Sequence, residues 1–503
     1  MTAAPARVVM LQGTASHAGK TVLAAALCRI YARRGFRVAP FKAQNMALNS
    51  FVTQSGGEMG RAQVYQARAA GVEPHVDMNP VLLKPSSDAT SQVIVMGKPV
   101  AQMTVREYHD YQAEVWPLVT SAFERLRATC DLVVMEGAGS SAEVNLRGQD
   151  IVNMRMALHA RSPVVLVGDI DRGGVFASLL GHMELFAPEE RDLVAAFVIN
   201  KFRGDASQLD SGIAILQERT GVPTLGVVPF LEAWRGDEED SVAIDDGRHR
   251  AGPAAPLRIA VVRLPYISNF TDFEALAGEP DVDVRFVASP EDLEGAAAIV
   301  LPGTKSTIAD LGWLRRRGLD AAVCAAAAAR TPVIGICGGY QMLGRRILDP
   351  EHVESAAGAV DGLGLLDAET TFAAGKRTVR AGGELLGSPA AGVLGPAGTP
   401  VHGYEIHMGR TEVGPGAAPL LRLRAAGEAE HFDGAAAETV CGTYLHGLFD
   451  NPALRAAFLN ALRTARGLPP RSAFAPHIDD LDRLADHVEA HLDATLLEAI
   501  VGG

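Results

Sequence analysis

The stretch PVIGICGGYQ places one cysteine at the end of a β-branched run, with glycines on both sides. Cys337 follows Ile336 and precedes Gly338, a pattern that predicts a turn from a strand into a helix with the thiol at the sheet edge. The amino end of a helix favours the thiolate, which is the reactive form of cysteine. We therefore interpret Cys337 as a nucleophile rather than as a packed core residue.

A cysteine nucleophile needs a base within hydrogen-bond reach and donors that stabilise an oxyanion. His446 follows the strand-like run VCGTYL and is the candidate base. His402 and His407, in VHGYEIHMGRT, are rival candidates that we rank lower, because two histidines around Tyr-Glu more readily serve binding or domain contact. Gly303, in LPGT, and Gly338 carry the backbone N–H groups that we expect to form the oxyanion hole.

A second kind of chemistry is indicated near the N-terminus, where GTASHAGKT separates the run RVVMLQ from the helical pattern TVLAAALCRIYARR. Glycines let backbone N–H groups approach a phosphate, and the helix start adds partial positive charge. Gly13, Gly19, Lys20 and Thr21 therefore predict an ATP-binding loop, with Lys20 on phosphate and Thr21 on Mg²⁺. Five residues separate the two glycines, one more than in the usual pattern.

Polar side chains at the ends of neighbouring strands extend this expected ATP site. Glu136 ends DLVVMEG and is the second expected magnesium residue, because open α/β sheets bind ligands at that edge. Lys42 ends RVAPFK and is placed to reach phosphate. Asn200, in VINKF, either contacts adenine or simply terminates its strand.

Two series of apolar strands alternating with helical patterns must position these residues, so the chain is predicted to be α/β with parallel sheets. We expect a P-loop domain at 1–235, a linker at 236–256 and a second α/β domain at 257–450. Residues 451–503 are expected to form a helical extension of that second domain. The expected strands are RVVMLQ, RVAPFK, DLVVMEG, SPVVLVGDI, LVAAFVINKF and TLGVVPF, then LRIAVVRLPY, DVDVRFVAS, AAIVLPGT, TPVIGICGG and VCGTYLHG.

Composition limits the classes of partner. The 503 residues carry a net charge of −13, which argues against a nucleic-acid or anionic membrane surface. The sequence has no apolar run near the ~18 residues that a membrane span needs, and the short apolar run at its start is no signal peptide, so we expect a cytoplasmic protein. The five cysteines are scattered and do not indicate a disulfide framework.

GICGGYQMLG together with YLHG resembles the triad-type glutamine amidotransferase domain. The resemblance implies hydrolysis of glutamine through a thioester on Cys337, with His446 as the base and Gln341 among the glutamine-binding residues. Many members orient the base with a Glu two residues further on, where this chain has Leu448. The third member of the triad is either absent or supplied from elsewhere, such as by Glu405.

The long P-loop resembles that of dethiobiotin synthetase, and the two domains together are similar to the cobyrinate amide synthases of cobalamin biosynthesis. The resemblance covers about 1–235 and 257–450 and is carried by FKAQNMALNSFVT, GEMGRAQVYQARAAG, MNPVLLKP, GQDIVNM, DIDRGGVFAS, INKFRGD, LPYISNFTDFEAL, LPGTKSTIADL and HGYEIHMGRT. Related ligases place acids near Lys42, whereas Gln44 and Asn45 stand here, so the source of a second acidic metal ligand stays open.

The resemblance implies ATP and Mg²⁺ as cofactors and a corrinoid and glutamine as partners, and it leaves homo-oligomer formation open. The implied acceptor is adenosylcobyrinic acid a,c-diamide, amidated at its b, d, e and g carboxylates. Asp150, in GQDIVNM, is either on the substrate side or a helix N-cap. A polycarboxylate also needs a basic patch, for which the candidates by position are Lys84, Arg147, Arg155, Arg172 and Arg203.

Two alternatives remain at this stage. The chain could instead amidate the a and c carboxylates of cobyrinic acid, which the wording QNMALNS and DIDRGGVFAS disfavours. It could also be a P-loop switch or a glutamine-binding regulator with a vestigial catalytic domain. The intact Cys337 and His446 weigh against that reading.

Overall fold

The computed structural model describes residues 5–86, 89–231, 255–387, 393–472 and 480–502. The chain forms two compact units. Unit 1 comprises Met1–Ala47, Glu58–Glu239 and Asp479–Gly503, and unit 2 comprises Leu48–Gly57 and Asp240–Ile478. The predicted linker at 236–256 and the boundary at 235 lie almost wholly outside the described residues.

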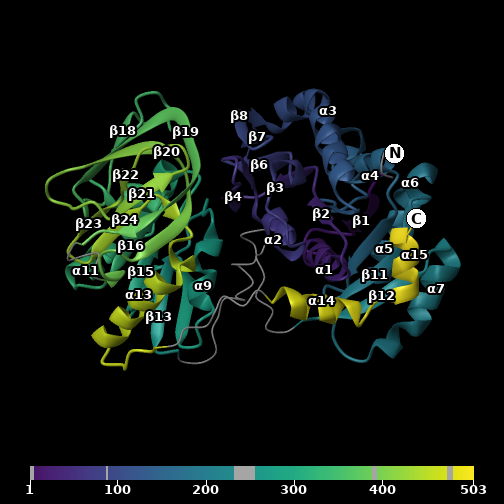
Figure 1. Ribbon diagram of the computed structural model, residues 1–503. Helices are drawn as coiled ribbons and strands as arrows, with labels where there is room; N and C mark the ends of the chain where they lie inside the picture. The colour runs from purple at the N-terminus through teal and green to yellow at the C-terminus, as the bar shows by residue number, and fades with distance from the viewer. Residues whose placement is uncertain (1–4, 87–88, 232–254, 388–392, 473–479, 503) are drawn as a thin grey trace. The chain divides into compact units, whose positions relative to one another are not determined.

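Unit 1 is built on a six-stranded parallel sheet of order β12-β11-β10-β1-β9-β2 (Figure 1). The strands are β1 (Arg7–Gly13), β2 (Val38–Phe41), β9 (Leu132–Glu136), β10 (Val164–Asp169), β11 (Val194–Phe202) and β12 (Thr224–Pro229). These strands confirm all six runs predicted for this half. Every residue of β2 and β9 is buried, as expected for strands covered on both faces.

Helices cover this sheet, and α1 follows β1 directly through the glycine loop. α1 packs against β1, β2 and β9, while α5 packs on β10. The helical elements of this part are α1 (Lys20–Arg33), α2 (Arg61–Ala69), η1 (Val76–Met78), α3 (Val105–Thr129), η2 (Val144–Gln149), α4 (Met154–Ala160), α5 (Val175–Leu185), α6 (Pro188–Arg191), η3 (Ala206–Leu209) and α7 (Asp210–Thr220).

A second, four-stranded sheet in unit 1 was not predicted. Its order is β3-β6-β7-β8, and β6, β7 and β8 form an antiparallel meander. Its strands are β3 (Gln44–Met46), β6 (Val81–Pro85), β7 (Thr90–Val95) and β8 (Lys98–Thr104), and the short β5 (Glu58–Gly60) precedes α2. β8 is largely exposed, so it lacks the apolar run by which the other strands were recognised.

The last two helices correct the predicted domain organisation. α14 (Leu481–Glu489) and α15 (Ala494–Gly502) belong to unit 1, where α14 packs along α1 and α15 contacts β1. Leu484 and Val488 of α14 are each 1% exposed and join the apolar cluster around α1. The prediction that all of 451–503 extends the second domain is therefore wrong for α14 and α15. The prediction did not take into account the apolar face of α1 that lies on the side away from the sheet.

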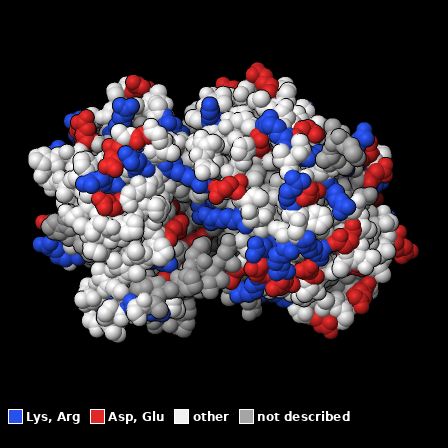
Figure 2. All heavy atoms as spheres, in the orientation of Figure 1, with Lys and Arg blue, Asp and Glu red and all other residues white. Residues whose placement is uncertain are grey.

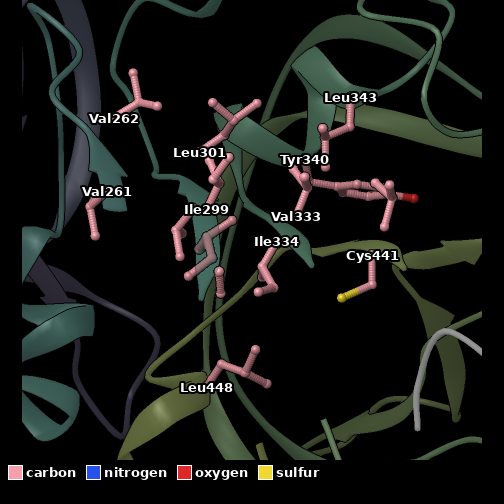
Figure 3. Packing of buried hydrophobic residues seen from close by; sticks show 14 of the residues in the cluster. Val261, Val262, Ile299, Leu301, Val333, Ile334, Tyr340, Leu343, Cys441 and Leu448 are labelled. Carbon is pink, nitrogen blue, oxygen red and sulfur yellow. The ribbon is translucent and has the colours of Figure 1, made fainter. Parts of the chain in front are cut away.

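Unit 2 has its own sheet, of order β14-β13-β15-β16-β24-β23, parallel except for β23 at one edge. Its strands are β13 (Leu257–Val262), β14 (Val282–Val287), β15 (Ala298–Leu301), β16 (Val333–Ile336), β23 (Ala435–Ala437) and β24 (Val440–Thr443). The five parallel strands confirm the runs predicted for this half. Figure 3 shows part of their core, a single apolar cluster that includes side chains of β13, β15, β16 and β24 as well as Tyr340 and Leu343.

The helical elements of unit 2 are mostly short. They are η4 (Phe270–Phe273), α9 (Glu274–Ala277), η5 (Pro290–Leu293), α10 (Thr307–Arg316), α11 (Leu319–Ala328), α12 (Gly338–Leu343), η7 (Leu448–Asp450) and α13 (Pro452–Ala465). α13 is the part of the predicted C-terminal extension that does belong to this unit.

A second sheet of unit 2, also unpredicted, is dominated by the long antiparallel pair β19 and β20. Its strands are β17 (Arg346–Leu348), β18 (Ala359–Asp361), β19 (Ala368–Leu385), β20 (Pro400–Val413), β21 (Leu421–Ala425), β22 (His431–Asp433) and β25 (Leu445–His446). β25 pairs with β20, with His446 opposite Tyr404. The segment that carries β4 (Ser50–Val52) also belongs to unit 2.

The described residues include no helix that is both long and apolar enough to cross a membrane. On the face drawn in Figure 2, acidic and basic side chains are intermixed. Within unit 1, α1 and α14 are joined by ion pairs of Arg29 with Asp482 and of Arg33 with Asp486 and Glu489.

Candidate functional site

Cys337 lies where the sequence predicted it, at the turn between β16 and α12. Its backbone angles are φ 52° and ψ −109°, a strained conformation that non-glycine residues rarely adopt. Its N–H donates to Thr443 O at 2.8 Å, and its Sγ lies 3.4 Å from Ile406 O. The second glycine after Cys337 is needed for close packing, because a Cβ on Gly339 would lie 1.9 Å from Leu301 O. The strand, the turn and the helix thus fix the thiol in one place.

His446 is the histidine that the structure brings to Cys337. It lies on β25, is 1% exposed, and its Nδ1 lies 2.7 Å from Asp272 Oδ2. Burial lowers the pKa of His446, but the charge of Asp272, its hydrogen bond and the Cys337 side chain outweigh burial and raise the pKa to about 10. Asp272 therefore fixes the ring with Nδ1 protonated and leaves Nε2 for chemistry.

Asp272 holds the place that the third member of a triad would take, and sequence analysis missed it. It lies on η4 and is 2% exposed, and its Oδ1 accepts a hydrogen bond from Gly447 N at 3.0 Å. The available signal was the acid in NFTDFEAL, a few residues after the strand-like run LRIAVV. The sequence separation of 174 residues from His446 hides the pairing.

Glu405, the suggested third member, lies in a different cluster. Its carboxylate accepts from Arg377 Nε at 2.9 Å and lies 3.4 Å from His431 Nε2. Burial raises the pKa of Glu405, but His407, whose Nε2 lies 3.7 Å from the carboxylate, and the charge of Arg377 prevail and lower the pKa to about 2. This carboxylate stabilises the second sheet and does not orient His446.

The rival bases are engaged elsewhere. His407 stacks on Tyr444 with ring centroids 3.7 Å apart, and its Nδ1 lies 2.7 Å from Gly409 O. His402 is an exposed residue of β20. His446 is thus the histidine that pairs with Asp272, and its ranking above the other two as the base stays a prediction.

The candidate oxyanion loop and the start of α12 meet beside the triad. A Cβ on Gly303 would lie 3.0 Å from His446 Cε1, and one on Gly338 would lie 3.2 Å from Thr304 N. Ser268 N donates to Gly303 O at 2.8 Å, which holds the loop. The placement agrees with an oxyanion hole made by Gly303 and Gly338, and their role in catalysis stays a prediction.

Gln341 lies one turn along α12 and is 3% exposed. Its Oε1 accepts from Thr307 Oγ1 at 2.9 Å, and its Nε2 donates to Tyr444 Oη at 3.2 Å. Both ends of the amide are therefore held by the protein. Its predicted contact with substrate glutamine stays a prediction.

In unit 1, the glycine loop after β1 has the expected form. Gly19 adopts φ +96°, and a Cβ there would lie 2.1 Å from Asn200 Nδ2. Lys20 Nζ donates to Ala15 O at 3.0 Å and to Gly139 O at 2.9 Å, so it lies across the mouth of the loop that begins at Gly13. Asn200 Nδ2 donates to Ala18 O at 2.9 Å. Asn200 thus supports the loop, and its contact with adenine stays a prediction.

Glu136 is the centre of a buried polar cluster at the end of β9. Its Oε1 accepts from Thr21 Oγ1 at 2.7 Å and from Lys42 Nζ at 3.0 Å, and its Oε2 accepts from Gln66 Nε2 at 2.5 Å. Gln63 Nε2 lies 3.4 Å from the same Oε2. The structure thus brings Thr21, Lys42 and Glu136 together as predicted, while Gln63 and Gln66 were missed.

The loop after β9 is tied to the glycine loop by residues that sequence analysis did not single out. Asn153 Oδ1 accepts from Ala138 N at 3.1 Å, and Asn153 Nδ2 donates to Ala138 O at 3.0 Å. Ser141 N donates to Gly13 O at 3.1 Å. These bonds place Gly139 O where Lys20 reaches it.

Asp150 lies between η2 and α4, three residues before Asn153, which is the N-cap of α4. Its Oδ1 accepts from Val152 N and Asn153 N, both at 2.9 Å, just before α4. Burial raises the pKa of Asp150 and outweighs the backbone hydrogen bonds, which act to lower it. Asp150 thus holds the turn before α4 without being its N-cap, so the capping interpretation is wrong in the residue, and a role toward substrate stays a prediction.

The suggested basic patch is not a set of free cations. Lys84 Nζ forms a buried pair with Glu58 at 2.9 Å, and Arg155 stacks over Trp116 at 4.2 Å. Arg203 lies over Phe230 at 3.7 Å, and Arg147 pairs with Glu190 at 3.3 Å. Their predicted contact with substrate carboxylates is untested, as is that of Arg172.

Two family models match the two units. Residues 9–242 match the CobQ/CobB/MinD/ParA nucleotide binding domain, and residues 258–454 match the CobB/CobQ-like glutamine amidotransferase domain. Each match contains the site residues described for its unit.

Curated relatives are similar over nearly the whole chain. A cobyric acid synthase of Sorangium cellulosum (strain So ce56) is 54% identical over 99% of both chains. One of Desulforudis audaxviator (strain MP104C) is 52% identical over 99% of both chains. A third, of Moorella thermoacetica (strain ATCC 39073 / JCM 9320), is 49% identical over 99% of this chain and 98% of its own. With such identity over both units, the chain belongs to the cobyric acid synthase family.

Proposed function

We propose that this enzyme amidates the b, d, e and g carboxylates of adenosylcobyrinic acid a,c-diamide, with glutamine as nitrogen donor and ATP as activator. The observation that carries the proposal is the triad of Cys337, His446 and Asp272 in a chain that also holds a P-loop around Lys20. Family membership supports the reaction class. The proposed compartment is the cytoplasm, and all five cysteines are free thiols.

The ammonia is released in unit 2. The Cys337 thiolate attacks the side-chain carbonyl carbon of glutamine, and the backbone N–H groups of Gly303 and Gly338 stabilise the oxyanion. His446 gives its Nε2 proton to the leaving nitrogen, so ammonia departs and a thioester remains. Water, deprotonated by His446, then hydrolyses the thioester to glutamate and regenerates the thiol.

The acceptor carboxylate is activated in unit 1. A carboxylate repels nucleophiles and has no good leaving group, so its oxygen first attacks the γ-phosphorus of ATP and releases ADP. Lys20 neutralises charge on the transferring phosphoryl group. Ammonia then attacks the acyl phosphate, and inorganic phosphate leaves as the amide forms. Four such cycles consume four ATP and four glutamines.

Mg²⁺ is the metal proposed for the nucleotide. A hydroxyl and a carboxylate lie 2.7 Å apart at Thr21 and Glu136, and hard oxygen ligands of this kind suit Mg²⁺. The described residues contain no group of three or more His, Cys, Asp or Glu side chains that could hold a metal alone, which fits a cation bound partly by phosphates. Mg²⁺ there would neutralise phosphate charge, and Lys42 would balance Glu136.

The substrate-side proposals are confined to a few residues. Asp150 remains a candidate because its Oδ2 accepts a single, longer hydrogen bond, from Asn153 N at 3.2 Å. Lys84 and Arg203 are candidates for corrinoid carboxylates through exchange of their present partners Glu58 and Asp171. Homo-oligomer formation is compatible with this scheme and is not required by it.

The central test is the variant Cys337→Ala with two nitrogen sources. Because the thiol acts only on glutamine, glutamine-dependent amidation should fall by about 10⁴-fold or more, while amidation with added ammonium salt should stay near the wild-type rate. Amide formation on the corrinoid, followed by chromatography and mass, measures both rates.

Cys441→Ala is the matched control, since Cys441 is a buried cysteine of β24 outside the triad. It should keep both activities. Equal loss with glutamine and with ammonia in Cys337→Ala would contradict the two-site proposal. To test the acceptor, the wild type is assayed with the a,c-diamide and with cobyrinic acid. Preferential amidation of cobyrinic acid at a and c would replace the proposed substrate by the alternative one.

A further inference from the structure

Residues 48–57 form a segment of unit 2, although the chain on both sides of it, up to Ala47 and from Glu58, belongs to unit 1. Asn49 and Ser50 within it are each 1% exposed. Buried polar groups in a connecting segment are stable only when they are hydrogen-bonded, so their partners indicate what the segment does.

The segment and the turn before η4 hold each other by a reciprocal pair of hydrogen bonds. Phe270 N donates to Asn49 Oδ1 at 3.0 Å, and Ser50 N donates to Asn269 Oδ1 at 3.0 Å. Asn269 is 2% exposed and adopts φ 53°, in the left-handed region. The side-chain bond to Ser50 thus helps to hold a backbone conformation that is otherwise unfavourable.

The same turn carries the third member of the triad. Asp272 N donates to Asn269 O at 3.0 Å, so the residue that contacts the segment also starts the turn of η4. Asp272 then accepts from His446 and Gly447 through its two oxygens. A shift of the turn would therefore move the carboxylate that orients the catalytic imidazole.

A second set of contacts reaches the other side of His446. Tyr404 Oη donates to Ser50 O at 3.3 Å, and the Tyr404 ring lies 5.2 Å from that of Phe51. The Tyr404 ring also stacks on His446, with centroids 5.4 Å apart and planes at 17°. Arg380 Nε donates to Val52 O at 2.8 Å and fixes the far end of the segment.

We propose that segment 48–57 positions the glutaminase triad, with Asn49 holding the Asn269–Asp272 turn and Tyr404 holding the ring of His446. Asn49 is a positioning residue, because it contacts neither glutamine nor the reacting atoms in this scheme and acts through Asp272. The proposal rests on the proposed glutaminase function and adds that a segment preceded and followed by unit 1 sets the geometry of the triad.

The test is the full-length variant Asn49→Ala, assayed for glutamine hydrolysis and for amidation with added ammonia. Loss of the acceptor for Phe270 N should lower the kcat of glutamine hydrolysis by about 10- to 100-fold, as expected for a modest misplacement of catalytic groups. The KM for glutamine should stay within about twofold, and the ammonia-dependent rate should be unchanged, because neither depends on Asp272.

Two further variants separate positioning from packing. Asn49→Asp keeps an oxygen acceptor for Phe270 N and should recover most of the kcat. Asn460→Ala removes a part-buried asparagine of α13 that makes hydrogen bonds with Arg463 and Arg471, away from the triad. It should lower thermal stability without lowering the glutaminase kcat.

Wild-type glutaminase kcat in Asn49→Ala would overturn the proposal, as would equal loss of the ammonia-dependent rate. If Asn49→Ala does not fold, Arg380→Met tests the other end of the segment and should lower the glutaminase kcat by about 3- to 10-fold. An unchanged kcat in that variant would also overturn it. Failure of the proposed function can be told apart from failure of this proposal. It would appear as equal loss of the glutamine-dependent and ammonia-dependent rates in Cys337→Ala, whatever the result for Asn49→Ala.

Discussion

The two oxygens of Asp272 have separate hydrogen-bond partners, so one carboxylate fixes both the ring of His446 and the backbone next to it. Oδ2 accepts from His446 Nδ1, and Oδ1 accepts from Gly447 N, the next backbone amide. The ring and the backbone that carries it are thus held by the same group. Rotation of the imidazole away from Cys337 would break the first bond while the second still held the backbone.

Replacement of Asp272 by Asn should lower glutaminase kcat by about 10³- to 10⁴-fold, because an amide no longer fixes the Nδ1–H tautomer or stabilises the imidazolium. Ammonia-dependent amidation should be retained. The matched control is Glu405→Gln, which should keep glutamine hydrolysis within about one order of magnitude. A larger loss in Glu405→Gln than in Asp272→Asn would assign the third triad position to Glu405.

The same variant should change the pH dependence of stability. The folded-state pKa of His446 is raised to about 10. The stabilisation of the folded state by protonated His446 is therefore fully present below the unfolded pKa of 6.5 and is lost as the pH rises through 10. Asp272→Asn should lower that pKa and flatten the stability profile over this window. Urea unfolding from pH 6 to 10 measures the difference, and parallel profiles would contradict it.

At the scale of elements, α13 and α14 are neighbours in sequence but stabilise different units. Leu462 of α13 is 2% exposed in the core of unit 2, and Leu484 of α14 is 1% exposed in the cluster around α1. Arg29 and Arg33 of α1 and its C-cap residue Arg34 also pair with acids of α14 and α15. Exposed pairs of this kind contribute little, so the apolar contact is the main stabilising term.

Leu484→Ala and Leu462→Ala should each lower the free energy of unfolding of one unit by about 2–5 kcal/mol, because each leaves a cavity. Hydrogen exchange followed by mass spectrometry assigns the loss to peptides. Protection should fall in α1 and β1 for Leu484→Ala and in β13 and β15 for Leu462→Ala. Loss of protection in unit 2 for Leu484→Ala would contradict the assignment of α14 to unit 1.

The parallel strands of the two main sheets were predictable because most of them are apolar in nearly unbroken runs, as burial on two faces requires. The second sheets were not, since strands such as β8 and β19 have exposed or half-buried residues and carry glycine, lysine and arginine. Cys337 and the glycine loop were predictable because each is a local motif. Asp272 was not, because only the tertiary fold brings it to His446.

At the scale of the whole molecule, the two units have separate cores, and the proposed function gives them separate ligands. Unit 1 has its apolar cluster around α1 and β1, and unit 2 has its own around β13 and β16. Binding to a folded unit stabilises that unit by mass action and leaves the other one unaffected unless the two are coupled.

Saturating MgATP should therefore stabilise unit 1 by about 2.7 kcal/mol at 100 times its dissociation constant. Calorimetry of the full chain should show the transition of unit 1 moving to higher temperature while that of unit 2 stays in place. Lys20→Ala is the control that should remove the shift. A shift of the unit 2 transition alone would contradict nucleotide binding at the glycine loop.

Because α14 and α15 belong to unit 1, the ribosome completes unit 1 only after it has made unit 2. Domains fold as the ribosome delivers them, yet the first unit to emerge needs the last two helices to cover α1. Unit 2, complete once α13 has emerged, can fold earlier. Under the proposed function, a nascent chain therefore passes through a stage in which the glutaminase unit can be complete while the unit that activates the acceptor is not.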